Sequence, residues 1–134
     1  MKKGIDSFEL ASHVKQTSYS AKDYWTVTIS YYSMLYMAKA AILSKGFETD
    51  DHYSTQIALG VLFVPDRIEK EDLELLNQTH KIFEEEYIDF FDDARKESRT
   101  SRYSATKFYS ERRVQEVSEN ARKFIAKMRL ILET

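Results

Sequence analysis

The chain contains no cysteine, one proline and three glycines among its 134 residues. The lack of cysteine excludes a disulfide framework and metal sites built from thiolates. The scarcity of helix-breaking residues favours long helices over a fold of strands and tight turns. A length of 134 residues is typical of one domain, and either half alone would struggle to bury a core. We therefore expect a single domain over residues 1–134.

Long uncharged apolar runs are also absent. The N-terminal segment Met1–Asp6 is charged and leads into no apolar region, and no stretch approaches the roughly 18 apolar residues that a membrane-spanning helix needs. We therefore expect a cytoplasmic protein without a membrane-spanning segment. The formal net charge of −2 gives no overall attraction to nucleic acid.

Three helices are predicted in the first half of the chain. The strongest prediction is a helix over about residues 21–45 that is apolar around nearly its whole circumference and ends at Gly46. A helix of this kind belongs at the centre of a bundle. A shorter helix is predicted from a capping-box pattern at Asp6–Glu9 to about Tyr19, and another over 52–63.

Two amphipathic stripes follow in the second half, each with steps of three and four residues. A long helix is predicted to begin near Ile68, with the seam Leu73, Leu76, His80, Phe83, Tyr87, Phe90 and Ala94. The last helix has the seam Ser110, Val114, Val117, Ala121, Phe124, Met128 and Ile131. Short connections between long helices favour antiparallel packing. The predicted fold is all-α, an up-and-down bundle of four to five helices.

The usual signatures of metal and nucleophilic sites are missing. Carboxylate-bridged di-iron bundles use Glu-x-x-His on two helices, whereas Glu9 and His13 are four residues apart. His80 lies on an apolar stripe, where a hydrogen-bonded core histidine is the commoner case. No G-x-S-x-G motif occurs, and three glycines are too few for a phosphate-binding loop. We expect no metal and no other cofactor.

Charge is distributed unevenly, because an acidic block over 69–93 is followed by a basic block over 95–113. The second block contains Arg99, Arg102 and Tyr103 among several hydroxyl residues, where the apolar pattern is interrupted. Arginine offers paired donors that suit phosphate, and basic residues interleaved with aromatic ones can hold single-stranded nucleic acid. Two interpretations stay open at this point. The segment is either an anion site or an exposed junction paired with nearby glutamates.

The stretch Ser30–Leu43, which reads SYYSMLYMAKAAIL, is followed by Lys45-Gly46-Phe47 and then by His52. It resembles the HEPN family, in which a helix reading Tyr-Tyr-Ala-Met-Phe and then Ala-Ala ends in a glycine, and a histidine opens the next helix. The resemblance resumes at Arg99 and Tyr103 and in the last helix, and covers roughly residues 21–133. It implies a helical bundle that dimerises and has a link to nucleotides or RNA.

Many HEPN proteins are metal-independent RNases, and many act beside a minimal nucleotidyltransferase in toxin–antitoxin pairs. The active members carry Arg-x(4–6)-His before the last helix, whereas here Arg99 is followed by Tyr103 and by no histidine at that spacing. The chain is more similar to a branch of the family with an arginine and a tyrosine. The resemblance therefore implies a nucleotide- or RNA-binding module, weakly or non-catalytic, with a nucleotidyltransferase partner. Arg99, Arg102, Tyr103 and His52 are its expected binding residues.

Two other functions stay open. One is an RNase that uses Tyr103 or a displaced histidine as its base, and the other is a structural module whose aromatic helix faces a partner. We also expect a two-fold homodimer with the Arg99–Tyr103 segments near the shared cleft, because so aromatic a domain has more apolar surface than one small bundle hides.

Overall fold

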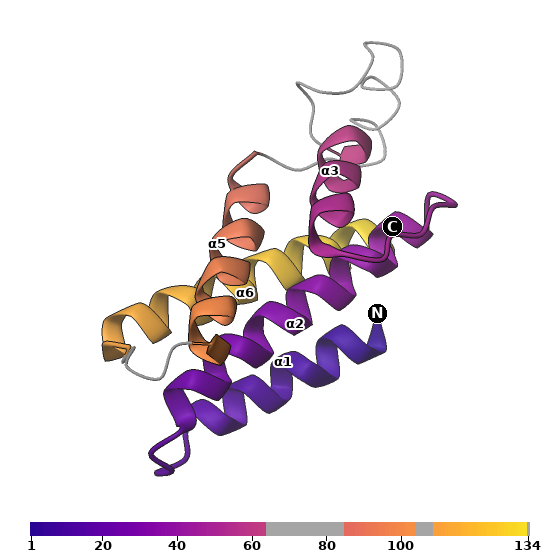
Figure 1. The fold of residues 1–134 in the computed structure, drawn as a ribbon. Helices are drawn as coiled ribbons and strands as arrows, with labels where there is room; N and C mark the ends of the chain where they lie inside the picture. Colours follow the sequence, from indigo (N-terminus) through magenta and orange to yellow (C-terminus); the bar gives the residue numbers. More distant parts are fainter. Residues whose placement is uncertain (64–84, 104–108, 134) are drawn as a thin grey trace.

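A computed structural model describes residues 1–63, 85–103 and 109–133, and for 101–103 only the backbone. All the secondary structure in these segments is helical (Figure 1), which confirms the predicted all-α bundle. The helices are α1 (Lys2–Lys15), α2 (Lys22–Leu43), α3 (His52–Phe63), α5 (Glu85–Tyr103) and α6 (Glu111–Glu133). None of these helices is both long enough and apolar enough to cross a bilayer.

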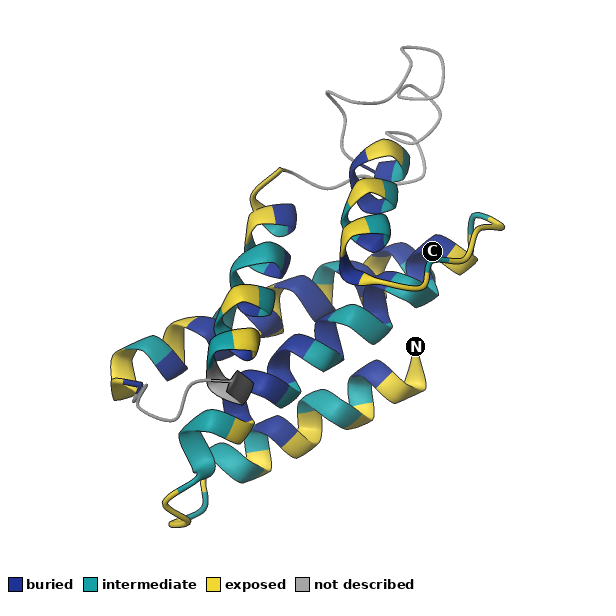
Figure 2. Cartoon of the chain, in the orientation of Figure 1, coloured by how far each residue is buried: buried dark blue, intermediate teal, exposed yellow. Residues whose placement is uncertain are grey.

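Helix α2 occupies the centre of the bundle, as its sequence predicts. It packs against α1, α3, α5 and α6, and α1 runs antiparallel beside it (Figure 1). Buried residues follow one another along most of its length (Figure 2). Its fully buried apolar side chains are Val27, Met34, Met37, Ala38, Ala41 and Ile42. Each large side chain among them stabilises the fold by about 1.5–3 kcal/mol through burial.

Local hydrogen bonds fix the connection from α2 to α3. Gly46 has φ 87°, and the N–H groups of Gly46 and Phe47 donate to the carbonyls of Leu43 and Ile42, which is a Schellman motif with glycine at the predicted C′ position. Asp51 then caps α3, because its Oδ1 accepts from the Ser54 N–H at 2.7 Å. The cap makes His52 the first residue of α3.

Helix α1 differs from its prediction at both ends. It begins at Lys2 and ends at Lys15, so the expected capping box at Asp6 is wrong. The Asp6 carboxylate accepts instead from Lys2 Nζ at 3.0 Å, four residues earlier on the same helix. Gly4 and Ala11 are the buried residues of α1. The helix extends back to Lys2 because the small residue Gly4 lets its first turn pack closely on α2.

The seam of α5 agrees with the predicted stripe at Ala94, which is buried, but differs by one residue before it. Ile88 and Phe91 are buried in place of Tyr87 and Phe90, which are only half-buried, and Ser98 continues the seam. Both stripes have helical spacing, and the contacts of α5 with α2, α3 and α6 decide between them. The part of the predicted seam from Leu73 to Phe83, including His80, lies outside the described residues.

Helix α5 also continues through Tyr103, beyond the predicted interruption at Ser98. Ser98 is fully buried, seven residues after Phe91 and therefore on the same side of the helix. The prediction ended the helix at Ser98 because this small polar residue interrupts the apolar pattern. Arg99 consequently lies on a helix and not in an interhelical junction.

Helix α6 follows its predicted seam closely. Val114, Val117, Ala121, Phe124, Met128 and Ile131 are all buried. The exception is Ser110, which is exposed and caps the helix by accepting from the Arg113 N–H at 3.1 Å.

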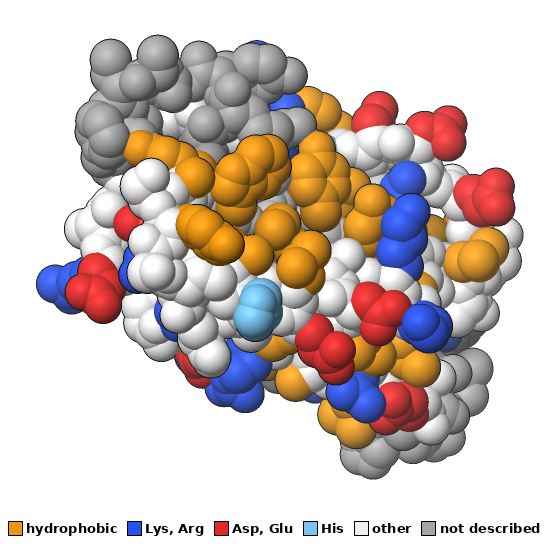
Figure 3. Space-filling model, turned by 90° about the horizontal axis from the view of Figure 1, so that it is seen from below, with side chains coloured by type: hydrophobic (Ala, Val, Ile, Leu, Met, Phe, Trp, Pro, Cys, Tyr) orange, Lys and Arg blue, Asp and Glu red, His pale blue; other side chains and the backbone are white. Residues whose placement is uncertain are grey.

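Several large apolar side chains remain exposed on and near α1 and α2, among them Leu10, Tyr19 and Trp25. Figure 3 views the molecule from below Figure 1, where α1 lies, and shows apolar side chains gathered over part of this face. A hollow of about 430 Å³ at the α1–α2 corner is lined by Val14, Tyr19, Trp25 and Ile29 together with neighbouring residues.

The close approach of α1 to α2 predicts the effect of Gly4→Ala. An added Cβ would lie 2.6 Å from Met37 Cγ and 3.1 Å from the Met37 backbone nitrogen. Overpacking of this kind costs about 1–3 kcal/mol, partly offset by the helix propensity of alanine. We expect a net loss of about 1–2 kcal/mol in the free energy of unfolding, measured by urea titration.

The control is the same substitution in a Met37→Ala background. There the clashing side chain is gone, so Gly4→Ala should be neutral or stabilising. An equal loss in both backgrounds would show that the Met37 side chain is not the cause.

Candidate functional site

The expected binding residues lie on two helices that pack against each other. Arg99, Arg102 and Tyr103 belong to the C-terminal half of α5, and His52 opens α3. Arg99 is exposed, and the side chains of Arg102 and Tyr103 lie outside the described part of the chain. His52 contacts α5 at Phe91 and Asp92. Arg99 lies seven positions after Asp92, so along the α5 axis it is about 10 Å from the point at which His52 contacts the helix.

The His52 imidazole is part of the core between α2, α3 and α5. It is 8% exposed and stacks on the Phe91 ring at 4.5 Å between centroids. Its Nε2 lies 3.0 Å from Gln56 Oε1 and 3.5 Å from Asp92 Oδ1, two acceptors, so this nitrogen carries the hydrogen. Its Nδ1 then accepts from the Tyr31 hydroxyl at 3.0 Å. A neutral ring satisfies all these contacts.

The charge state of His52 follows from the same surroundings. Burial lowers its pKa, and the positive charge of Arg95 lowers it further, while the hydrogen bonds to Gln56 and Asp92 raise it. The net direction is downward from 6.5, so the ring is neutral at pH 7. Both nitrogens are used inside the protein. His52 therefore holds α3 against α5 and does not present a proton at the surface.

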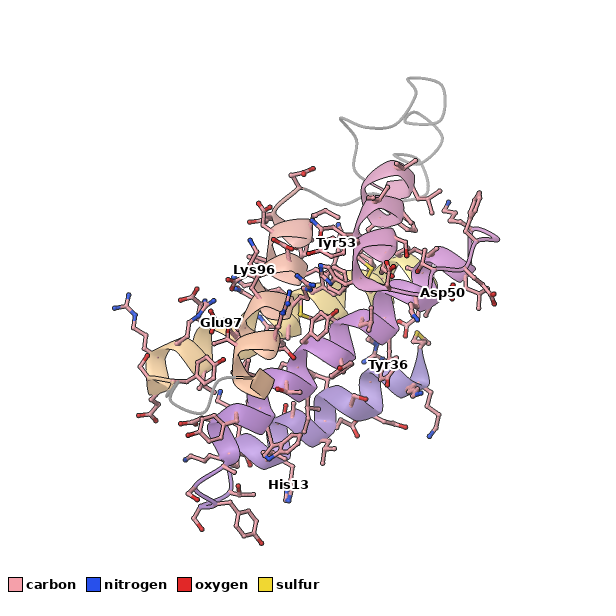
Figure 4. All side chains as sticks on the ribbon, in the orientation of Figure 1. His13, Tyr36, Asp50, Tyr53, Lys96 and Glu97 are labelled. Atoms are coloured by element: carbon pink, nitrogen blue, oxygen red, sulfur yellow. The ribbon has the colours of Figure 1, made fainter. Side chains whose placement is uncertain are left out.

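Tyr53, the next residue, joins α3 to α5 on the outside. Arg95 Nη1 donates to the Tyr53 hydroxyl at 3.0 Å, and the guanidinium carbon lies 4.6 Å from the centroid of the Tyr53 ring. Figure 4 shows Tyr53 between α3 and α5. This contact combines a hydrogen bond with a cation–π interaction and fixes the position of the guanidinium. Among the described residues, no carboxylate forms an ion pair with Arg95.

Arg95 and Arg99 differ in their partners from Lys96 beside them and from several arginines of α6. Within the described residues, neither forms an ion pair with a carboxylate. By contrast Lys96 pairs with Asp92 at 3.0 Å, and three arginines of α6, Arg113, Arg122 and Arg129, each pair with an acid. Arg95 and Arg99 are four residues apart, about 6 Å along the same side of α5. Two adjacent, uncompensated guanidinium groups form a surface suited to an anion.

The glutamate nearest to Arg99 in the sequence has a different partner. Glu97 Oε1 lies 3.4 Å from Arg113 Nη2, and Asp93 accepts from the same nitrogen at 2.7 Å. The Glu97 carbonyl accepts from the Tyr109 hydroxyl at 2.6 Å. This cluster joins α5 to the start of α6. It removes Glu97 as a partner for Arg99 and thereby favours the anion-site interpretation of the basic block.

Sequence reasoning missed Arg95, Tyr53 and Asp92 as residues of this surface. The spacing of Arg95 and Arg99 was a visible signal, because residues four apart share one side of a helix. Nothing in the sequence indicated the contact of Tyr53 with Arg95, because this contact depends on how α3 packs against α5. In the part of the chain that the structure describes, no three histidine, aspartate or glutamate side chains gather so as to hold a metal ion.

The comparison with protein families agrees with the residue pattern. The model of the HEPN domain family matches residues 3–131, which include the first helix as well as the segments noted in the sequence. The chain therefore belongs to the HEPN family. No curated protein sequence matches it significantly.

The lowered pKa of His52 predicts how stability changes with pH. Below about pH 6.5 the unfolded chain takes up a proton at His52 that the folded protein does not, so the free energy of unfolding falls as pH falls toward the lower pKa of the folded state. The loss from this one group is at most about 1.4 kcal/mol per pH unit. Urea titrations between about pH 8 and pH 5.5 measure it.

We expect His52→Gln to be less stable than the wild type near pH 8. Its free energy of unfolding should fall less steeply between pH 8 and pH 5.5, because the contribution of His52 is gone. His13→Gln is the matched control, because His13 is exposed on α1, and it should keep the wild-type slope. A wild-type slope in His52→Gln would contradict the assignment of a neutral, buried ring.

Proposed function

We propose that this HEPN protein binds the phosphate groups of a nucleotide or of RNA on the α5 surface that carries Arg95 and Arg99, and that it has weak or no catalytic activity. Membership of the HEPN family indicates a nucleotide- or RNA-related function. The observation that carries the proposal is the pair of arginines on one side of α5 without a carboxylate partner among the described residues. By helix register Arg102 falls on the same side, and we include Arg102 and Tyr103 in the proposed site.

The physical basis is charge and preorganisation. A guanidinium offers several N–H donors in a plane, which suits two phosphate oxygens at once. Arg95 is held in place by Tyr53, so little side-chain entropy is lost when it meets a ligand. Arg99 is exposed and lies one turn further along α5. The attraction is ionic and should weaken as salt concentration rises.

The two histidines that the structure describes support a binding role over an RNase. General acid–base catalysis needs a titratable side chain within reach of the substrate, most often a histidine. His52 is buried with both nitrogens engaged, and His13 lies exposed on α1, away from α5 (Figure 4). Tyr103, the other expected acid–base residue, belongs to a residue type that titrates near pH 10 and transfers protons poorly at neutral pH. Among the described residues, this surface therefore offers no accessible histidine for an RNase.

We further propose that the protein forms a homodimer and acts with a minimal nucleotidyltransferase, as in toxin–antitoxin pairs. The homodimer is supported by the exposed apolar side chains around the α1–α2 corner, where Tyr19 is 76% and Trp25 56% exposed. The nucleotidyltransferase partner rests on the HEPN resemblance alone.

The proposed dimer predicts that the mass measured by sedimentation velocity at micromolar protein rises with protein concentration. Burial of exposed apolar side chains at the interface removes them from water and favours association. Trp25→Ser should shift the protein toward the monomer. Leu130→Ser, which changes an exposed apolar side chain of α6, is the control and should leave the mass unchanged. A wild-type monomer at all accessible concentrations would contradict the dimer.

The binding proposal predicts that Arg99→Ala weakens binding of a labelled short single-stranded RNA and of ATP. The loss should be about 1.5–3 kcal/mol, the usual worth of a hydrogen bond to a charged group. The wild-type affinity should fall with salt, and the variant should show a shallower salt dependence. Fluorescence anisotropy at several salt concentrations measures both effects.

Arg129→Ala is the control for Arg99→Ala. Arg129 is also exposed on a helix but is paired with Glu133, so its removal should leave affinity nearly unchanged. Both variants should melt as the wild type does. Equal binding by wild type and Arg99→Ala would remove the site. Rapid metal-independent cleavage of the RNA by the wild type, lost in Tyr103→Phe, would establish the RNase instead.

A further inference from the structure

Tyr53 is unusually exposed for an aromatic residue whose position is fixed. Its relative exposure is 58%, although it is the second residue of α3, directly after the Asp51 cap. The His52 ring meets it edge-on at 83° and 5.6 Å, and Arg95 lies over it at 4.6 Å. Among the described residues these are its only ring and cation contacts. The ring is thus held from two sides while much of its surface faces solvent.

We propose that Tyr53 is a stacking platform for an unpaired nucleobase, which makes the ligand of the α5 surface a free nucleotide or single-stranded RNA. This inference rests on the proposed function and specifies the ligand class of the same site. An exposed, rigid aromatic ring gains from stacking and loses little conformational entropy when it does so. A base inside a duplex already stacks on its neighbours and cannot supply that contact.

The neighbouring side chains suit such a ligand. Arg95 places positive charge against the Tyr53 ring, and bases stack on aromatic rings and guanidinium planes alike. Arg99 lies one turn after Arg95, about 6 Å further along α5. There it can contact the phosphate of the same nucleotide or of the next one. On the other helix Ile57 follows Tyr53 by one turn and is 63% exposed, so it extends the apolar surface beside the ring.

A purely structural role for Tyr53 makes a different prediction. If the ring only holds Arg95 in place, its loss should weaken binding of every phosphate ligand equally. If the ring also stacks on a base, its loss should weaken binding of a ligand with bases much more than binding of a ligand without them. A pair of ligands that differ only in their bases therefore separates the two roles.

The experiment compares a short single-stranded RNA that contains 2-aminopurine with an abasic ribose-phosphate oligomer of the same length. We expect the wild type to bind the RNA about 5- to 150-fold more tightly than the abasic oligomer, the range usual for stacking of one base. Binding should also quench the 2-aminopurine fluorescence, because the base stacks. Tyr53→Phe keeps the ring and should retain most of this preference.

Tyr53→Leu is the decisive variant. It should lose the preference for RNA and the quenching. Its affinity for the abasic oligomer should fall by much less than its affinity for RNA, because Arg95 and Arg99 remain and only the preorganisation of Arg95 by Tyr53 is lost. Leu130→Ala, which removes an exposed apolar side chain of α6 outside the proposed site, is the control and should leave the preference unchanged. Circular dichroism and thermal melting confirm that each variant is folded.

Two other outcomes overturn the proposal in distinguishable ways. Equal weakening of both oligomers by Tyr53→Leu, with binding still sensitive to Arg99→Ala, means that Tyr53 acts only through Arg95. The phosphate site then stands and the stacking platform does not. If neither oligomer binds the wild type, or if Arg99→Ala has no effect on either, both the platform and the proposed function fail.

Discussion

Burial of α2 on nearly all sides is the constraint on which the rest of the structure depends. The other four described helices each pack against it, and its largest core side chains, such as Met34, Met37 and Ile42, are fully buried. A helix that is apolar all round is stable only when neighbours cover it. α1 covers it through the close contact of Gly4 with Met37, while α3, α5 and α6 cover the remaining sides. The positions of α3 and α5, and hence the candidate site, follow from this arrangement.

The candidate site depends on a division of roles between buried and exposed neighbours. His52 and Phe91 stack in the core and hold α3 against α5, while Tyr53 and Arg95 make the outer contact between the same helices. The acids of this region are taken by other cations, Asp92 by Lys96 and Asp93 by Arg113. Arg95 and Arg99 are left with their charge uncompensated among the described residues. An anionic ligand is the partner that this electrostatic pattern favours.

Much of the fold was predictable because periodicity reports which side of a helix is buried. The bounds of α3, the glycine at the end of α2 and the seam of α6 all agree with the sequence patterns. The patterns failed where two possible buried stripes had the same helical spacing, as with the stripes through Phe90 and Phe91 in α5. They also failed where a small polar residue, Ser98, lies inside a buried seam. They also failed for α1, where a local capping pattern competed with close packing on α2.

The sequence by itself determined the all-α class, the central position of α2 and the HEPN resemblance, because these depend on local spacing and residue type. It also pointed to Arg99 and the basic block. Only the tertiary structure decided that His52 is buried and neutral, that Glu97 pairs with Arg113, and that Tyr53 meets Arg95. Those facts are contacts between residues far apart in the chain. They depend on the packing of α3 and α6 against α5, which no local pattern specifies.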